Sequence, residues 1–273
     1  MATYLLKKSY RSKDLKQISF KDLWNSNGIF TTMWIFGKPP KILFFNDHID
    51  NLIKSLKIYN LYKKNTKNII IKYIKLNIKK NFRYNHLLRV ALNNKNISIS
   101  LRKRLTPRLN FNLKLVNYKR YRPEFKNLKY KKILNYLSKM NTSKTDIALC
   151  VNKQILESGT SNILFVKNNQ IYSPRNKFYK GITFKFFEKK VKKIIKKDIY
   201  IDYLKNFDEI ILIGSGKGVV SVNNIDRPKW RRKSLTTYRL LSNIYFQAVT
   251  KCPRYNGWSI ISIILDILLD FEI

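Results

Sequence analysis

The chain has 273 residues, and its 56 Lys and Arg residues against 16 Asp and Glu residues give a formal net charge of +40 at pH 7. Hydrophobic residues make up 44% of the sequence and aromatic residues 14%, which is enough apolar material for a core and excludes a disordered chain. The two cysteines exclude a disulfide framework, and no Cys and His residues have the spacing of a zinc site.

The ends of the chain give no sign of a membrane or a secretory route. The N-terminus has no apolar stretch typical of a signal peptide. The longest apolar run, residues 258–269, is interrupted by Asp266 and is too short to span a bilayer. We therefore expect a cytoplasmic protein without a membrane partner.

The charge of +40 first suggests a nucleic-acid-binding protein. The basic residues, however, are spread through nearly every segment and are mixed with Asn and Ile. Lys, Asn and Ile are the residues that AT-rich codons encode, so a codon bias explains the charge. Neither an aromatic RNA-binding strand nor a recognition helix is found. We expect no specific nucleic-acid partner.

The first part of the chain predicts a small α/β domain, residues 1–120. β-branched and aromatic residues predict a strand over 28–36, which the turn residues 37–40 reverse into a second strand over 41–45. Apolar residues at helical spacing predict a helix after residue 46 and another over 66–80. A hairpin around 93–96 and a strand over 111–118 complete this domain.

The polar stretch 119–127 marks the domain boundary, and residues 121–250 are predicted to form a C-terminal domain. It begins with a helix near 128–140 and a meander of short strands. A helix opens at Gly181 and Ile182, two strands flank a glycine-rich loop, and a last helix covers about 233–249. Residues 251–273 are a tail with the apolar spacing of an amphipathic helix. The predicted fold class is α+β.

Three groups of residues could carry chemistry. They are the lysine-containing stretch 125–130, the stretch 156–165 around Glu157, and the two loops 180–183 and 214–218. Each is weak alone, since the second loop fits neither a Walker A nor a GxGxxG pattern. Together they supply a lysine, a carboxylate, and a helix N-terminus and glycine-rich loop that suit a phosphate. Pyridoxal phosphate requires this combination of groups.

Over about residues 26–225 the sequence resembles the class IV aminotransferases, which are the fold-type IV pyridoxal-phosphate enzymes. The segments that carry the resemblance occur in the family's order. They are GIFTTM at 28–33, HIDNL at 48–52, FKNLKY at 125–130, ILESGTSNILFV at 155–166, IYSPRNKFYKGIT at 171–183 and EIILIGSGKGVVSVNNID at 209–226. The resemblance implies the two-domain, D-amino-acid aminotransferase-like fold with the active site between the domains, a pyridoxal 5'-phosphate cofactor in residues 121–250, and a homodimer.

The resemblance allows two candidates for the lysine that binds the cofactor. Lys132 fits the local pattern K-x-x-N-Y better, but Lys126 fits the chain length better. Glu157 lies 31 positions after Lys126 (157 − 126) and 25 after Lys132 (157 − 132). Only the longer interval holds a complete helix, a loop and a strand. We therefore choose Lys126 as the catalytic residue and keep Lys132 as the alternative.

The resemblance also implies the residues around the cofactor. Glu157 pairs with the pyridine nitrogen, Tyr130 lies near the phenolic oxygen, and Asn162 supports a loop. The phosphate is held by residues of the two loops and by the residue in the place of the family's phosphate-binding arginine. These are Gly181, Ile182, Thr183, Ser215, Gly216 and Asn51.

The chain departs from the family at three places. Asn51 replaces the arginine of H-x-x-R-L and brings no charge to the phosphate; Lys54, three residues on, is a candidate to compensate. Phe184 replaces the arginine of GITR, and Lys129 replaces the asparagine before Tyr130. Weaker cofactor binding or a degenerate, inactive family member is therefore one of the alternatives.

The sequence Phe30-Thr31-Thr32 resembles that of some 4-amino-4-deoxychorismate lyases, with Thr31 and Thr32 as substrate contacts. Such an enzyme eliminates pyruvate to form 4-aminobenzoate for folate synthesis. We favour this lyase over the alternative, a branched-chain or D-amino-acid aminotransferase. Either substrate is a small anionic compound with an amino group, and the positive charge of the chain attracts it.

Overall fold

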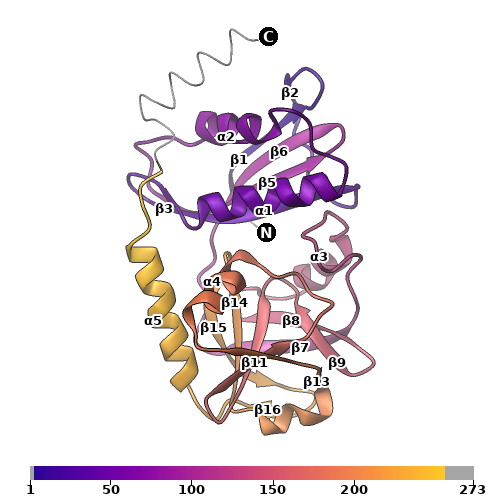
Figure 1. Cartoon of the computed structure of the whole chain (residues 1–273), viewed down its shortest axis with the longest axis vertical. Coiled ribbons are helices and arrows are strands. Elements are labelled where there is room, and N and C mark those ends of the chain that lie inside the picture. Colours follow the sequence, from indigo (N-terminus) through magenta and orange to yellow (C-terminus); the bar gives the residue numbers. More distant parts are fainter. Residues whose placement is uncertain (1–2, 256–273) are drawn as a thin grey trace. The chain divides into compact units, whose positions relative to one another are not determined.

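The structure is a computed structural model that describes residues 3–255, and the tail predicted at 251–273 lies mostly outside the described residues. The chain divides into two compact units, shown in indigo to magenta and in magenta to yellow in Figure 1. Unit 1 comprises the described residues up to Leu23, Gly28–Arg104 and the described residues from Cys252 onward; unit 2 comprises Trp24–Asn27 and Leu105–Lys251.

Unit 1 contains an antiparallel sheet with the strand order β2-β1-β6-β5-β3-β4. The predicted hairpin is confirmed as β5 and β6, and the predicted strand at 28–36 is confirmed as β3. The strands are β1 (Tyr4–Arg11), β2 (Gln17–Ile18), β3 (Gly28–Gly37), β4 (Lys41–Ile42), β5 (Tyr84–Asn93) and β6 (Asn96–Lys103).

Two helices complete unit 1, and both were predicted. Helix α1 (Phe45–Ile58) packs its buried residues, among them Leu52 and Leu56, against β3. Helix α2 (Thr66–Asn77) stacks Tyr73 on Tyr10 of β1 at 3.7 Å between ring centroids. The strand predicted over 41–45 is shorter than expected, because Phe44 has a left-handed backbone (φ 55°) that turns the chain into α1.

Unit 2 contains a larger mixed sheet with the order β12-β11-β10-β14-β15-β7-β8-β9-β13, and β16 pairs with β15. The sheet curls, so that β9 also contacts β10 and β11. Its strands are β7 (Phe111–Asn117), β8 (Thr145–Val151), β9 (Gln154–Ser158), β10 (Asn162–Lys167), β11 (Gln170–Pro174), β12 (Ile194–Lys197), β13 (Ile199–Tyr200), β14 (Glu209–Gly214), β15 (Gly218–Ile225) and β16 (Trp230–Arg231).

The helices of unit 2 are short, apart from the last one. They are α3 (Lys131–Ser138), α4 (Ile182–Lys190), the 3₁₀ helix η1 (Ile201–Asn206) and α5 (Thr236–Thr250). The curled sheet encloses an apolar core that includes Phe111, Phe165 and Leu212, each essentially inaccessible to solvent. This core holds the ends of β8, β9, β10 and β14 in place, and those ends carry the residues of the candidate site.

The division between the units precedes the boundary at 120/121 that the polar stretch 119–127 suggested. Strand β7 pairs in parallel with both β8 and β15, so it belongs to the sheet of unit 2. The polar stretch that follows β7 is therefore a loop within unit 2, and the division falls between Arg104 and Leu105.

Candidate active site

The carboxylate of Glu157 is buried at the end of β9 and forms an ion pair with Arg120. Arg120 Nε donates to Glu157 Oε1 at 2.6 Å and Arg120 Nη2 donates to Oε2 at 3.0 Å. Both residues are 5% exposed. Burial raises the pKa of Glu157, and the charge and hydrogen bonds of Arg120 counteract this shift. Burial lowers the pKa of Arg120, but Glu157 outweighs it and raises that pKa, so Arg120 stays protonated beside Glu157.

Glu157 keeps room for one more donor. A carboxylate offers about four lone-pair sites. Arg120 occupies one site on each oxygen, and the backbone N–H of Tyr179 donates to Oε2 at 3.3 Å. Among residues 3–255 no other group donates to this side chain, so one acceptor site remains on Oε1. Oε1 can therefore accept a hydrogen bond from a further donor.

Arg120 also shapes the loop that follows it. Its Nη2 donates to the carbonyl of Pro123 at 2.6 Å and its Nη1 to the carbonyl of Phe125 at 3.0 Å. The buried amide of Asn127 donates to the carbonyl of Tyr121 at 2.7 Å. The backbone on both sides of residue 126 is therefore fixed by side chains inside the loop.

The structure distinguishes the two candidate lysines. Lys126 is half-buried, its Nζ lies 5.9 Å from the ring centroid of Tyr179, and its charge acts on Glu157. Lys132 is exposed on α3, with its Nζ 4.7 Å from the ring centroid of Tyr118. Only Lys126 therefore shares surroundings with Glu157, and the position of Lys132 inside a helix agrees with the chain-length argument.

Tyr130 connects the lysine loop to the turn after β9. Its hydroxyl donates to the carbonyl of Gly159, and its ring stacks on Trp24 with 5.8 Å between centroids. Lys129 points elsewhere, because its Nζ donates to the carbonyl of Asn25 at 2.9 Å. Lys129 therefore replaces the family's asparagine without entering the surroundings of Glu157.

Asn162 holds the N-terminus of α4, as its predicted supporting role requires. Its Nδ2 donates to the carbonyl of Tyr179 at 2.6 Å, and its Oδ1 accepts from the N–H of Gly181 at 3.0 Å. A Cβ on Gly181 would lie 2.8 Å from that same Oδ1, so only glycine permits the contact. Ile182 and Thr183 then begin the helix and are 5% and 1% exposed.

The phosphate-binding candidates of α4 and the glycine-rich loop lie together. Thr183 Oγ1 and Ser215 Oγ are 3.4 Å apart. The loop lies close to Ser161, since a Cβ on Gly214 would be 3.1 Å from Ser161 Oγ. That buried Oγ has no hydrogen-bond partner among the described residues. The Ser161 hydroxyl, the hydroxyls of Thr183 and Ser215, and the N-terminus of α4 together form a donor set that fits a phosphate monoester.

The remaining predicted residues belong to unit 1. Thr31 is buried, and its Oγ1 lies 2.8 Å from His48 Nδ1, while Thr32 is half-buried on the opposite face of β3. Asn51 lies on α1, half-buried, and Lys54 is exposed one turn later. The structure therefore separates the two threonines, which cannot contact the same ligand from one face of the strand.

Phe184, in the place of the family's second arginine, is part of the core. Its ring is inaccessible to solvent, contacts Phe178 edge-on at 5.6 Å and lies 4.1 Å from Lys196 Nζ. Lys196 Nζ in turn donates to Glu188 Oε1 at 2.7 Å. The ammonium over the ring is a cation–π contact, so a positive charge remains near this turn of α4.

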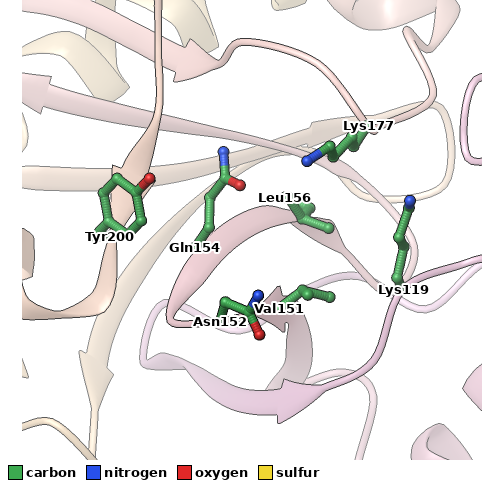
Figure 2. Close-up of a pocket in the computed structure, with 7 residues that line it drawn as sticks. All are labelled: Lys119, Val151, Asn152, Gln154, Leu156, Lys177 and Tyr200. Atoms are coloured by element: carbon green, nitrogen blue, oxygen red, sulfur yellow. The ribbon is translucent and has the colours of Figure 1, made fainter.

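A separate pocket of about 210 Å³ lies in unit 2 beside the β8–β9 turn. Figure 2 shows that two lysine side chains, Lys119 and Lys177, line it on the same side of Leu156. The other lining residues are Val151, Asn152, Gln154 and Tyr200. Because Lys126 and Glu157 are absent from this lining, the pocket is distinct from the candidate active site.

Sequence reasoning missed Arg120 and Tyr179, which hold the site's other residues in place. Arg120 pairs with Glu157 across 37 positions of the sequence. Tyr179 contributes its backbone to both Glu157 and Asn162.

No group of three or more potential metal ligands occurs among residues 3–255. In the same range no helix is long and apolar enough to cross a membrane.

A sequence model of class IV aminotransferases matches residues 28–225. The chain belongs to the class IV aminotransferase family. The predicted α+β class and fold-type IV fold are thereby confirmed, and the match begins at β3 and ends at the last residue of β15. It contains both the lysine loop and the candidate phosphate-binding loops.

Solved structures share this fold at low sequence identity. A branched-chain aminotransferase from Thermoproteus uzoniensis, with norvaline, has a TM-score of 0.74 and 15% identity over 94% of this chain and 98% of its own. A branched-chain aminotransferase from a T.th. strain, complexed with N-(5'-phosphopyridoxyl)-L-glutamate, has a TM-score of 0.72 and 15% identity over 92% and 97%.

A candidate 4-amino-4-deoxychorismate lyase from Legionella pneumophila has a TM-score of 0.64 and 15% identity over 81% of this chain and 91% of its own. None of the curated proteins is significantly similar in sequence. At these identities the class IV aminotransferase fold is shared by proteins of two different activities, so the fold does not select between them.

Proposed function

We propose that the protein is a pyridoxal-phosphate enzyme in which Lys126 binds the cofactor and Glu157 contacts its pyridine nitrogen. The observation that carries this proposal is the buried Glu157, which Arg120 fixes while one acceptor site on Oε1 stays open. The family supports the cofactor, and one of the structural neighbours contains a phosphopyridoxyl derivative. Ser215, Gly216, Ile182 and Thr183 are proposed to hold the phosphate.

The cofactor, when bound, supplies an electron sink for the bond that breaks next to the substrate amino group. The residues of this chain bind, orient and transfer protons. Glu157, paired with Arg120, would accept a hydrogen bond from the protonated ring nitrogen. Lys126 would hold the cofactor through its amine, and that amine would then move a proton at the carbon next to the substrate amino group. Tyr130 fixes the turn at Gly159 and would lie on the phenolic side of the cofactor.

For the reaction itself, we propose elimination of pyruvate from 4-amino-4-deoxychorismate, giving 4-aminobenzoate for folate synthesis. The supporting feature is the sequence Phe30-Thr31-Thr32 on β3. Because the Thr31 hydroxyl is hydrogen-bonded to His48, Thr32 is the threonine that we retain as the substrate contact. The net charge of +40 favours an anionic substrate. We propose that the enzyme acts in the cytoplasm as a homodimer.

The experiment has two stages. The purified protein is titrated with pyridoxal phosphate, and a visible absorbance band should form that Lys126→Ala abolishes and Lys132→Ala preserves. A band that depends on Lys132 would overturn the assignment of Lys126 as the cofactor-binding lysine. A wild-type protein that forms no band would overturn the proposal that the protein is a pyridoxal-phosphate enzyme. The loaded enzyme is then given 4-amino-4-deoxychorismate. Pyruvate release supports the lyase, whereas a 2-oxo acid formed from a branched-chain or D-amino acid identifies an aminotransferase.

A further inference from the structure

A second buried ion pair lies next to the candidate phosphate-binding loop. The Lys217 ammonium is 3.1 Å from Asp146 Oδ2 and donates to Thr160 Oγ1 at 2.8 Å. The side chain of Asp146 is 0% exposed and that of Lys217 is 10% exposed. A lysine in a glycine-rich loop can bind a phosphate directly, but this ammonium already faces a carboxylate.

Asp146 accepts hydrogen bonds from three groups, and a further hydroxyl lies near it. The backbone N–H of Ile147 donates to Oδ1 at 2.8 Å, and the hydroxyl of Thr160 donates to Oδ2 at 2.8 Å. The Lys217 ammonium is 3.1 Å from Oδ2, and the Ser158 hydroxyl lies 3.2 Å from Oδ2 but closer, at 2.9 Å, to the Ser161 carbonyl. Thr160 and Lys217 thus occupy both acceptor sites of Oδ2. The turn after β9 lies against Oδ1, since a Cβ on Gly159 would be 3.0 Å from it, so the contacts of Asp146 serve the protein.

The pair joins three segments of unit 2. Asp146 lies at the start of β8, Thr160 lies in the turn between β9 and β10, and Lys217 lies in the loop between β14 and β15. The turn crosses β8 so closely that a Cβ on Gly159 would lie 2.6 Å from Ile147 Cγ1. At its other end the β14–β15 loop packs on Ser161 through Gly214. The loop is thus fixed on both sides of Ser215 and Gly216.

We propose that Lys217 and Asp146 are a positioning pair that sets the Ser215 hydroxyl and the Gly216 N–H for the phosphate of the cofactor. Lys217 acts through the loop backbone and does not touch the phosphate. This inference rests on the proposed function, since it assigns a role toward pyridoxal phosphate. It differs from that function because it concerns residues that carry no chemistry themselves.

The competing explanation, direct contact between Lys217 and the phosphate, makes an opposite prediction for Asp146. Removing the carboxylate charge would free the ammonium for the phosphate and would leave binding unchanged or tighter. If the pair positions the loop, removing either charge loosens the same loop. Losses at the two sites are then similar and do not add, because one interaction is lost once.

The test measures the dissociation constants of pyridoxal phosphate and of pyridoxal, which lacks the phosphate, by absorbance titration. The variants are Lys217→Met, Asp146→Asn and the double variant. Each single substitution is expected to weaken the binding of pyridoxal phosphate about tenfold and to leave the binding of pyridoxal unchanged. The double variant should bind pyridoxal phosphate no more weakly than either single variant. Lys167→Met, an exposed lysine at the end of β10, controls for the loss of one positive charge.

A milder variant guards against misfolding. Thr160→Val keeps both charges and removes one hydroxyl from the network, and it should weaken the binding of pyridoxal phosphate about fivefold. Lys217→Arg, which keeps the charge, should bind more tightly than Lys217→Met. Equal weakening of pyridoxal and pyridoxal phosphate in all these variants would reduce the pair to a purely structural role and overturn the inference.

Two further outcomes separate this inference from the proposed function. If the wild type binds pyridoxal phosphate and Asp146→Asn binds it as tightly or more tightly, the positioning role is wrong while the proposed function stands. If the wild type binds neither compound, both are wrong. The ³¹P chemical shift of the bound cofactor gives an independent readout, and the positioning role requires it to change in Lys217→Met.

Discussion

Unit 2 contains two buried pairs of a cation and a carboxylate, and they differ in what lies against each carboxylate. Three hydrogen bonds from Arg120 and Tyr179 leave Glu157 one open acceptor site. At Asp146, Thr160 and Lys217 occupy both sites of Oδ2, and the Gly159 turn lies against Oδ1 beside the Ile147 N–H. Both carboxylates need a partner cation because burial penalises an isolated charge. The difference in what covers the remaining acceptor site indicates which carboxylate meets a ligand and which one holds the loops.

The strongest way to break the first pair is Arg120→Met. It leaves the Glu157 carboxylate buried without its cation and removes two hydrogen bonds to loop carbonyls. We expect the free energy of unfolding, measured with urea, to fall by about 3–5 kcal/mol. Arg122→Met is the matched control, because its contact with Glu124 is long (3.8 Å) and solvent-exposed, and it should cost less than about 1 kcal/mol. Equal losses would contradict the comparison.

The comparison is sharpened by neutralising each carboxylate in turn. Glu157→Gln should lower kcat on the order of 10²-fold, even when cofactor is saturating, because the ring nitrogen loses its counter-charge. Asp146→Asn should act mainly on the dissociation constant of the cofactor and leave kcat at saturation largely unchanged. Steady-state kinetics at increasing cofactor concentrations separate the two. The reverse ranking of kcat values would mean that Asp146, and not Glu157, meets the cofactor.

The turn that crosses Asp146 provides a smaller effect. A Cβ on Gly159 would be 2.6 Å from Ile147 Cγ1 and 3.0 Å from Asp146 Oδ1. Gly159→Ala should therefore destabilise the protein by about 1–3 kcal/mol through overpacking. It should also disturb the Tyr130 contact at the Gly159 carbonyl. A thermal unfolding midpoint equal to that of the wild type would show that the turn has room that the structure does not provide.

The smallest expected effect is that of Ser158→Ala. The Ser158 hydroxyl lies near Asp146, donates to the Ser161 carbonyl at 2.9 Å and accepts from the N–H of Ser161 at 2.8 Å. Asp146 keeps Ile147, Thr160 and Lys217 as donors, so the loss should be about 1 kcal/mol in urea unfolding. A loss as large as that of Arg120→Met would indicate that Asp146 depends on the Ser158 hydroxyl.

Much of the fold followed from the sequence because its signals are local. The hairpin of β5 and β6, the start of α4 at Ile182 and the strands around the glycine-rich loop each have a periodicity or a turn of their own. The pattern at 41–45 failed because a left-handed Phe44 diverts the chain into α1. Strand β1 alternates weakly, and its pairing with the distant β6 has no local signal.

The site was predictable only in part. Lys126, Glu157 and the two loops stand out because each belongs to a short motif. Their partners do not, since Arg120 is 37 positions from Glu157 and Asp146 is 71 positions from Lys217. In a chain with 56 Lys and Arg residues, composition cannot show which cation is buried. Only the curled sheet brings these partners together.

Asn162 has a further consequence for the chemical stability of the site. Its side chain donates to the Tyr179 carbonyl and accepts from the Gly181 N–H, and a carboxylate can only accept. Hydrolysis of this amide to aspartate would therefore break one bond. It would also place a negative charge at the N-terminus of α4, where the helix dipole would hold it in competition with the phosphate. Deamidation of Asn162 would therefore weaken the binding of the cofactor phosphate at this end of α4.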